Sequence, residues 1–121
     1  MTETISAQDY RDMVKPKKSK YRNKKTKVGD LTFDSRAEAA RFEELLILKE
    51  SGVIRDLRLQ VSYPVYINDV KIFTYRADFV YEMVDTGEVV VEDVKGYRTP
   101  IYKLKKKAVE AYWGFKITEY P

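Results

Sequence analysis

Three charged residues have the types and spacing of a metal-assisted hydrolytic site. Asp78 lies in one strand-like segment, and Asp93 and Lys95 lie two residues apart in the next. Side chains two residues apart on a strand share a face, so Glu92 should point to the opposite one. Two neighbouring carboxylates repel each other, and a divalent cation such as Mg²⁺ relieves this repulsion. The set therefore predicts metal-assisted phosphodiester hydrolysis, with Lys95 beside the attacking water.

A tight hairpin is expected to bring these residues together. If residues 86–87 form a two-residue loop, Val80 lies opposite Asp93 and Asp78 lies opposite Lys95. A change of one residue in this register would move the side chains to different faces. The alternative interpretation is an ordinary salt bridge between Lys95 and either aspartate at the exposed end of the sheet.

A helix predicted over residues 36–50 supplies a third carboxylate, Glu38. Ser35 is a suitable N-cap three residues before Glu38, which is the spacing of a capping box, and Gly52 lies where a C-terminal cap belongs. Glu38 also begins the apolar stripe that continues at Phe42, so it should face the sheet. Two compatible roles remain for Glu38, as a cap partner of Ser35 or as a member of the carboxylate cluster.

The remaining pattern predicts a mixed α/β layer fold in one domain over residues 25–121. Strands are expected at 25–33 with a bend at Gly29-Asp30, and at 53–61, 70–84, 89–95 and 115–120. A further segment at 63–67 continues past Pro64 and is expected to belong to an edge or a bend. A second helix should begin at Thr99-Pro100 and end at Gly114. The apolar stripe of this helix comprises Ile101, Leu104, Ala108, Ala111 and Tyr112, and the lysines lie on the other face.

Composition excludes several classes of chemistry. The chain has neither cysteine nor histidine, so disulfides, thiolate catalysis, a zinc ribbon and imidazole-based catalysis are excluded. Residues 11–27 carry nine basic side chains and one acidic one, whereas the rest of the chain has a net charge of −4. A basic N-terminal arm at 1–24 suggests a polyanionic partner, the alternative being a solubilising tail. No signal peptide or membrane-spanning run is present, so a cytoplasmic location is expected.

Three ordered motifs resemble those of the PD-(D/E)XK nuclease superfamily. They are Phe33-Asp34-Ser35-Arg36-Ala37-Glu38, Arg76-Ala77-Asp78-Phe79 and Val91-Glu92-Asp93-Val94-Lys95-Gly96. Within the superfamily, the chain looks most like a small phage-encoded group related to archaeal Holliday junction resolvases and to the nuclease subunit of Tn7-type transposases. The resemblance covers about residues 20–119 and departs from the pattern at Ala77, which replaces a proline, and at Asp93, which replaces the commoner glutamate.

The resemblance implies a restriction-endonuclease-like αβββαβ core and an Mg²⁺ or Mn²⁺ ion. Its ligands would be Asp78, Asp93, Glu38 and the main-chain carbonyl of Val94, and Lys95 would be the catalytic lysine. Gln60 lies where relatives often place a polar residue of the active site.

The implied substrate is DNA that is recognised by its structure rather than by its base sequence. The implied setting is phage recombination or replication within a bacterial host cell. The expected DNA-binding residues are Lys17, Lys18, Lys20, Arg22, Lys24, Lys25, Arg98, Lys103, Lys106 and Lys107. Branched or junction DNA is favoured over plain duplex, and the resemblance to resolvases allows a homodimer. Two alternatives remain: a nucleic-acid-binding accessory protein that keeps the fold without catalysis, and a small basic interaction protein.

Overall fold

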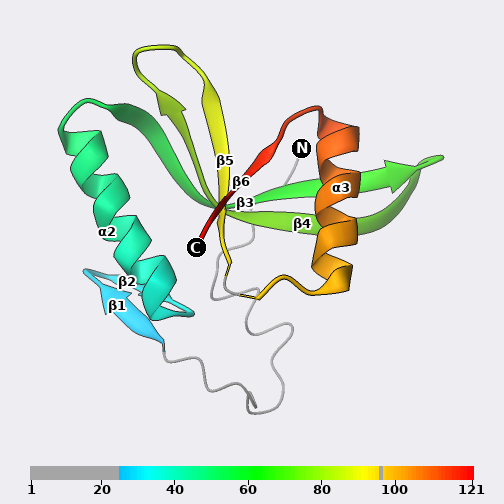
Figure 1. Ribbon diagram of the computed structural model, residues 1–121, viewed down its shortest axis with the longest axis horizontal. Coiled ribbons are helices and arrows are strands. Elements are labelled where there is room, and N and C mark those ends of the chain that lie inside the picture. Colours follow the sequence, from blue (N-terminus) through cyan, green and yellow to red (C-terminus); the bar gives the residue numbers. More distant parts are fainter. Residues whose placement is uncertain (1–24, 96) are drawn as a thin grey trace.

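The computed structural model describes residues 25–95 and 97–121 (Figure 1). The elements are β1 (Thr26–Val28), β2 (Leu31–Phe33), α2 (Arg36–Glu50), β3 (Ile54–Ile67), β4 (Val70–Met83), β5 (Val89–Val94), α3 (Pro100–Trp113) and β6 (Ile117–Tyr120). Helices α2 and α3 lie on either side of the strands, so the predicted mixed α/β class is confirmed. The predicted arm at 1–24 lies outside the described residues, and with it Lys17, Lys18, Lys20, Arg22 and Lys24.

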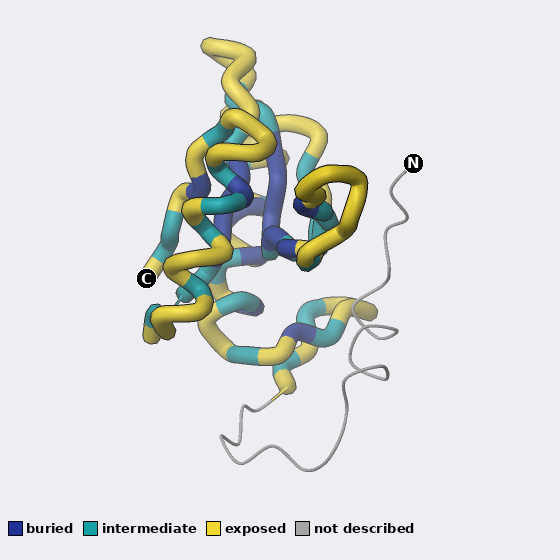
Figure 2. Tube along the Cα trace, turned by 90° about the vertical axis from the view of Figure 1, so that its right-hand side faces the viewer, coloured by how far each residue is buried: buried dark blue, intermediate teal, exposed yellow. Residues whose placement is uncertain are grey.

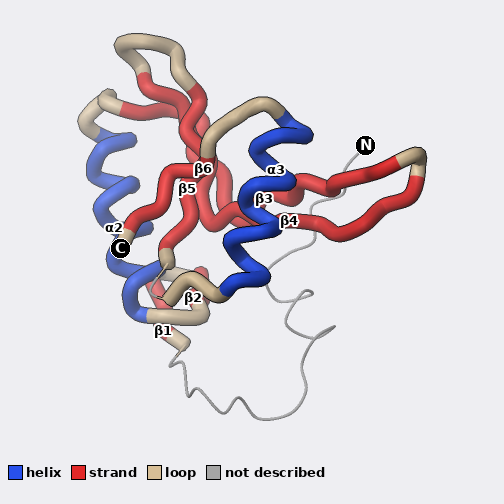
Figure 3. Tube along the Cα trace, turned by 45° about the vertical axis from the view of Figure 1, so that its right-hand side comes forward, coloured by secondary structure: helices blue, strands red, loops and turns tan. Residues whose placement is uncertain are grey.

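The main sheet has the order β3-β4-β5-β6 (Figure 3). Strands β3, β4 and β5 are antiparallel neighbours, whereas β6 pairs parallel to β5 after the crossover through α3. Strand β5 therefore lies inside the sheet, as its nearly continuous apolar sequence predicts. Strands β1 and β2 form a separate hairpin at Gly29, where one strand with a bend was expected.

The predicted helix over 36–50 is confirmed together with both caps. The side chain of Ser35 accepts a hydrogen bond from the Glu38 amide at 3.1 Å. At the other end, Gly52 has a φ of +80°, a left-handed conformation that costs glycine little. The amides of Gly52 and Val53 donate to the carbonyls of Lys49 and Leu48. These two bonds form a Schellman motif, which satisfies carbonyls that the helix end leaves without partners.

Strand β3 is longer than the sequence predicts, because the expected strand at 53–61 and the segment at 63–67 are one. It contains Pro64, which pairs with Thr74 of β4. A proline cannot donate to a neighbouring strand, and among the described strands β3 is an edge strand that pairs with β4 alone. Of the two alternatives expected for the segment past Pro64, an edge or a bend, the structure has the edge, and the break after residue 61 is wrong.

The predicted register of the β4–β5 hairpin is wrong by two residues. Val80 pairs with Val91 rather than with Asp93. The hairpin closes where the Met83 amide donates to the Glu88 carbonyl at 2.8 Å, so its loop is longer than two residues. Because side chains alternate with a period of two, a shift of two residues keeps every side chain on its predicted face.

Two apolar clusters form the core, and Figure 2 shows the buried segments at the centre of the molecule. The cluster beneath α2 contains Phe33, Ala39, Phe42, Leu45, Ile54, Phe79 and Tyr81. The cluster beneath α3 contains Val65, Tyr75, Ala77, Val80, Val91, Val109 and Ile117. Two acidic residues of β5, Glu92 and Asp93, are buried among these clusters. None of the helices in the described part of the chain is long and apolar enough to span a membrane.

The predicted sheet-facing stripe of α3 is wrong. Ile101 and Leu104 are 65% and 68% exposed, whereas Val109 is fully buried. Lys106, expected on the solvent face, is half-buried and pairs with Glu110 at 3.0 Å. On its buried side α3 instead carries Val109, in the same apolar cluster as Val91 and Ile117, and Tyr102, whose hydroxyl donates to Glu119 of β6 at 2.9 Å.

Candidate active site

A pair of aspartates, the half-buried Asp78 of β4 and the buried Asp93 of β5, lies on the two inner strands of the sheet. Continued by one residue beyond the Phe79–Glu92 pair, the β4–β5 register places Asp78 opposite Asp93 rather than opposite Lys95. The Asp78 Oδ2 atom accepts a hydrogen bond from the Val94 amide at 2.8 Å, and Asp93 is only 2% exposed. The structure thus brings together the two aspartates that the sequence singles out, through a register different from the predicted one.

The surroundings of the Asp78 carboxyl disfavour its ionised form. Burial, the hydrogen bond with Asp93 and the negative charges of Glu38 and Asp93, partly offset by the Val94 amide, together raise the pKa of Asp78 to about 9. A carboxylate in such surroundings is neutral at pH 7 because its charged form is poorly solvated and repelled. A cation placed between the two groups would favour the ionised form instead.

The Lys95 ammonium lies beside Asp93, on the more exposed side of the Asp78–Asp93 pair. Its Nζ lies 3.7 Å from Asp93 Oδ2, and its side chain is 31% exposed. The same Nζ lies 4.7 Å from the centre of the Tyr102 ring. The predicted common face of Asp93 and Lys95 is therefore confirmed.

Glu38 is half-buried in the first turn of α2 and acts electrostatically on Asp78, whose pKa it raises. Its main-chain amide meanwhile donates to the cap residue Ser35. The Glu38 amide therefore takes part in the helix cap while the Glu38 carboxylate lies near the aspartates. The two roles that the sequence left open for Glu38 occur together.

Gln60 lies across from Asp78. The pairs Leu59–Phe79 and Val61–Ala77 flank this position in the β3–β4 ladder. Gln60 has a φ of +54°, a left-handed conformation that a residue with a Cβ adopts only at a cost. Strain of this kind collects at functional sites, where the surrounding structure maintains it.

Tyr75 is a site residue that the sequence analysis missed. Its hydroxyl donates a hydrogen bond to Asp93 Oδ2 at 2.7 Å. Burial, followed by the charge of Asp93, raises the pKa of Tyr75 well above its ordinary value, so the phenol stays protonated and keeps donating. Its only sequence signal is its position three residues before Asp78, among ten tyrosines.

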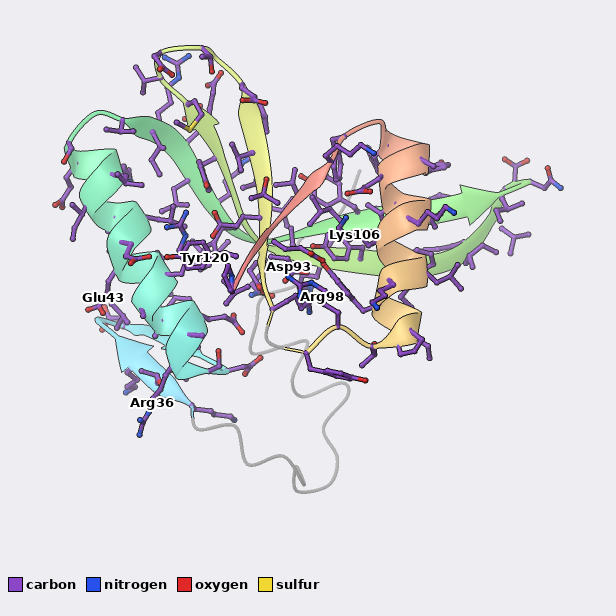
Figure 4. The ribbon with its side chains drawn as sticks, viewed as in Figure 1. Arg36, Glu43, Asp93, Arg98, Lys106 and Tyr120 are labelled. Carbon is purple, nitrogen blue, oxygen red and sulfur yellow. The ribbon has the colours of Figure 1, made fainter. Side chains whose placement is uncertain are left out.

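Glu119 is the second residue that was missed. In the parallel β5–β6 ladder it pairs directly with Asp93. Its Oε1 accepts a hydrogen bond from Arg98 Nε at 2.8 Å, and its Oε2 accepts one from the Tyr102 hydroxyl at 2.9 Å. Figure 4 shows Arg98 and Asp93 on the same side of the molecule, between the two helices. Only the alignment of β6 with β5 could have identified Glu119.

Glu92 points to the opposite face, as predicted. Its carboxylate accepts two hydrogen bonds from the Arg41 guanidinium, at 2.7 and 3.0 Å, and one from the Tyr81 hydroxyl at 2.6 Å. Burial and the bond to Glu92 raise the pKa of Tyr81 to about 12. Since its lone pairs are engaged beneath α2, Glu92 fastens the helix to the sheet and takes no part in the aspartate site.

A family model described as "Protein of unknown function (DUF1064)" matches residues 18–118. The chain belongs to this family. No curated protein and no solved structure matches the chain. The description of the family specifies no activity, so the function has to be argued from the site itself.

The donor set of this family member fits a hard divalent cation. Among residues 25–95 and 97–121, no group of three or more acidic side chains stands close enough together to form a ready metal cage. Mg²⁺ does not need one, because it is commonly held by one or two carboxylates and completes its shell with water and phosphate oxygens. Asp78 and Asp93, which lie opposite each other on β4 and β5, supply two such carboxylates.

The described basic residues that we expect to bind DNA differ in exposure and in their partners. Lys25, Lys103 and Lys107 are exposed. Arg98 is held by Glu119, and Lys106 is held by Glu110. Of the basic residues expected to bind DNA, these five belong to the described part of the chain.

Proposed function

We propose that this protein is a metal-dependent DNA endonuclease of the PD-(D/E)XK kind. The observation that carries the proposal is geometric: Asp78 lies opposite the buried Asp93, and Lys95 Nζ lies 3.7 Å from Asp93 Oδ2. Two facing carboxylates inside a sheet, together with a lysine, are poorly explained as a stabilising feature, because apolar residues would pack there at lower cost. They are well explained as ligands of a cation and a group that acts on phosphate.

Each residue has a role in this proposal. Asp78 and Asp93 would hold Mg²⁺ or Mn²⁺, with Glu38 and the Val94 carbonyl as further candidate ligands. The bound ion would supply Lewis-acid stabilisation of the charge that develops on the scissile phosphate. Lys95 orients the attacking water and offsets phosphate charge. Tyr75 keeps Asp93 in place through its hydroxyl.

The proposed substrate is branched or junction DNA in a phage recombination or replication pathway inside a bacterial cell, with a homodimer as the form that could make paired cuts. Among the described basic residues that we expect to bind DNA, Arg98 bonds to Glu119, the strand partner of Asp93. Lys103 and Lys107 offer exposed charge on α3. Binding through such phosphate contacts should weaken steeply with salt.

The test is cleavage of labelled four-way junction, flap, duplex and single-stranded DNA in Mg²⁺, Mn²⁺ or EDTA. Asp93→Asn and Lys95→Ala should both abolish cleavage. Asp85→Asn, which changes an exposed carboxylate in the β4–β5 turn, is the matched control and should cut normally. If every substrate survives in both metals while salt-sensitive DNA binding remains, the protein is instead a nucleic-acid-binding accessory protein that keeps the fold without catalysis.

A further inference from the structure

Lys95 is not fixed by Asp93 alone. Its Nζ lies 3.7 Å from Asp93 Oδ2, which is longer than an N–H···O hydrogen bond of about 2.7–3.2 Å. A lysine side chain has four rotatable bonds and a strongly hydrated ammonium, so a loose ion pair leaves it many conformations. A second contact is therefore needed to hold the Lys95 ammonium in one position.

The ring of Tyr102 is placed to do this. Lys95 Nζ lies 4.7 Å from the ring centre, within the range of a cation–π contact. Both the main chain and the hydroxyl of Tyr102 are fixed by hydrogen bonds. The Tyr102 amide donates to Thr99 Oγ1 at 3.0 Å in the first turn of α3, and the hydroxyl donates to Glu119 Oε2 at 2.9 Å.

Glu119 joins this support to the rest of the site. It pairs with Asp93 in the β5–β6 ladder, and its other carboxylate oxygen accepts from Arg98 Nε. Burial and the bond to Glu119 raise the pKa of Tyr102 above its ordinary value, so the phenol remains a donor at neutral pH.

We propose that Tyr102 is a positioning residue that holds the Lys95 ammonium beside Asp93 through the face of its ring, with Glu119 fixing the ring. The catalytic consequence rests on the proposed nuclease function, whereas the positioning of Lys95 does not. The ring face carries the effect, and the hydroxyl only steadies the ring.

Three variants separate this role from simple packing. Tyr102→Leu removes the ring, Tyr102→Phe keeps it and removes the hydroxyl, and Tyr112→Leu removes a half-exposed ring from the same helix as a control. For cleavage of the best DNA substrate, Tyr102→Leu should lower kcat by roughly 10- to 100-fold with KM almost unchanged, as expected when a reacting group is misplaced. Tyr102→Phe should restore most of kcat, and Tyr112→Leu should behave as wild type. An equal loss in Tyr102→Phe, or an unchanged kcat in Tyr102→Leu, would overturn the proposal.

A second measurement does not depend on cleavage. Lysine amines are labelled by reductive ¹³C-methylation, and the Lys95 signal is assigned by its absence in Lys95→Arg. Methyl groups over a ring face resonate upfield, so the Lys95 signal should be shifted in wild type and in Tyr102→Phe, and unshifted in Tyr102→Leu. If this pattern appears in a protein that cuts no DNA, the positioning holds and the nuclease function fails. If the protein cuts DNA but the signal is the same in all three, the positioning is refuted.

Discussion

Replacing Asp78 by asparagine is expected to stabilise the metal-free protein at neutral pH, although it removes a central side chain of the site. The folded-state pKa of Asp78 is raised from 3.8 to about 9. Below pH 4 the carboxyl is protonated in both the folded and the unfolded chain. As the pH rises towards 9, the unfolded chain releases this proton and the folded protein retains it, so stability falls through this range.

The size of the effect follows from the shift. One pKa unit corresponds to about 1.4 kcal/mol, so the free energy of unfolding at pH 7 should be about 4 kcal/mol lower than below pH 4 through this group. Asparagine has the shape of the protonated acid. Its oxygen can still accept from the Val94 amide, and its nitrogen can donate to Asp93. Asp78→Asn should therefore recover this free energy, which for a domain of this size raises Tm by on the order of 15 °C.

The assay is thermal unfolding between pH 4 and pH 9, in EDTA and in excess Mg²⁺. Wild type in EDTA should lose stability as the pH rises, and Asp78→Asn should lose much less. Mg²⁺ should raise the Tm of wild type, more at pH 8 than at pH 5 because it competes with the proton, and should leave Asp78→Asn unchanged. Asp85→Asn again serves as the control.

A Tm for Asp78→Asn that is lower than that of wild type at pH 8 in EDTA would refute the reasoning. It would mean that the carboxylate is ionised and stabilising in the metal-free protein. The Asp78–Asp93 pair would then be an ordinary structural feature rather than a site prepared for a cation.

Three further predictions concern the surroundings of the site. Glu92→Gln should lower the free energy of unfolding in urea by about 3 kcal/mol, because it breaks a buried ion pair while leaving Arg41 in place; an effect below about 1 kcal/mol would show that the pair does not fasten α2. Gln60→Gly should be about 1 kcal/mol more stable than Gln60→Ala, since only glycine adopts a φ of +54° without strain; equal stabilities would argue against strain there. Lys103→Glu combined with Lys107→Glu should weaken DNA binding and flatten its salt dependence without changing Tm, and an unchanged salt slope would remove this face of α3 from the DNA interface.

The features that the sequence determined are local. Both helix starts could be predicted from the sequence, because the side chains of Ser35 and Thr99 accept hydrogen bonds from the amides three residues further on. These bonds depend only on short-range geometry. The placement of Glu92 and Asp93 on opposite faces of the sheet could also be predicted, because side chains alternate along any strand. That alternation also explains why the aspartates meet although the predicted register was wrong by two residues.

The tertiary structure decided which distant groups complete the site. Tyr75 reaches Asp93 only through the observed strand pairing, and Glu119 does so only because the crossover through α3 aligns β6 with β5. The orientation of α3 was likewise decided by its neighbours: Ile101 and Leu104 of the predicted apolar stripe are exposed, whereas Val109 is buried in the cluster beneath the helix and Tyr102 bonds to Glu119. Local spacing fixes the caps and the alternation of faces, whereas partners and burial depend on long-range packing that no short stretch of sequence contains.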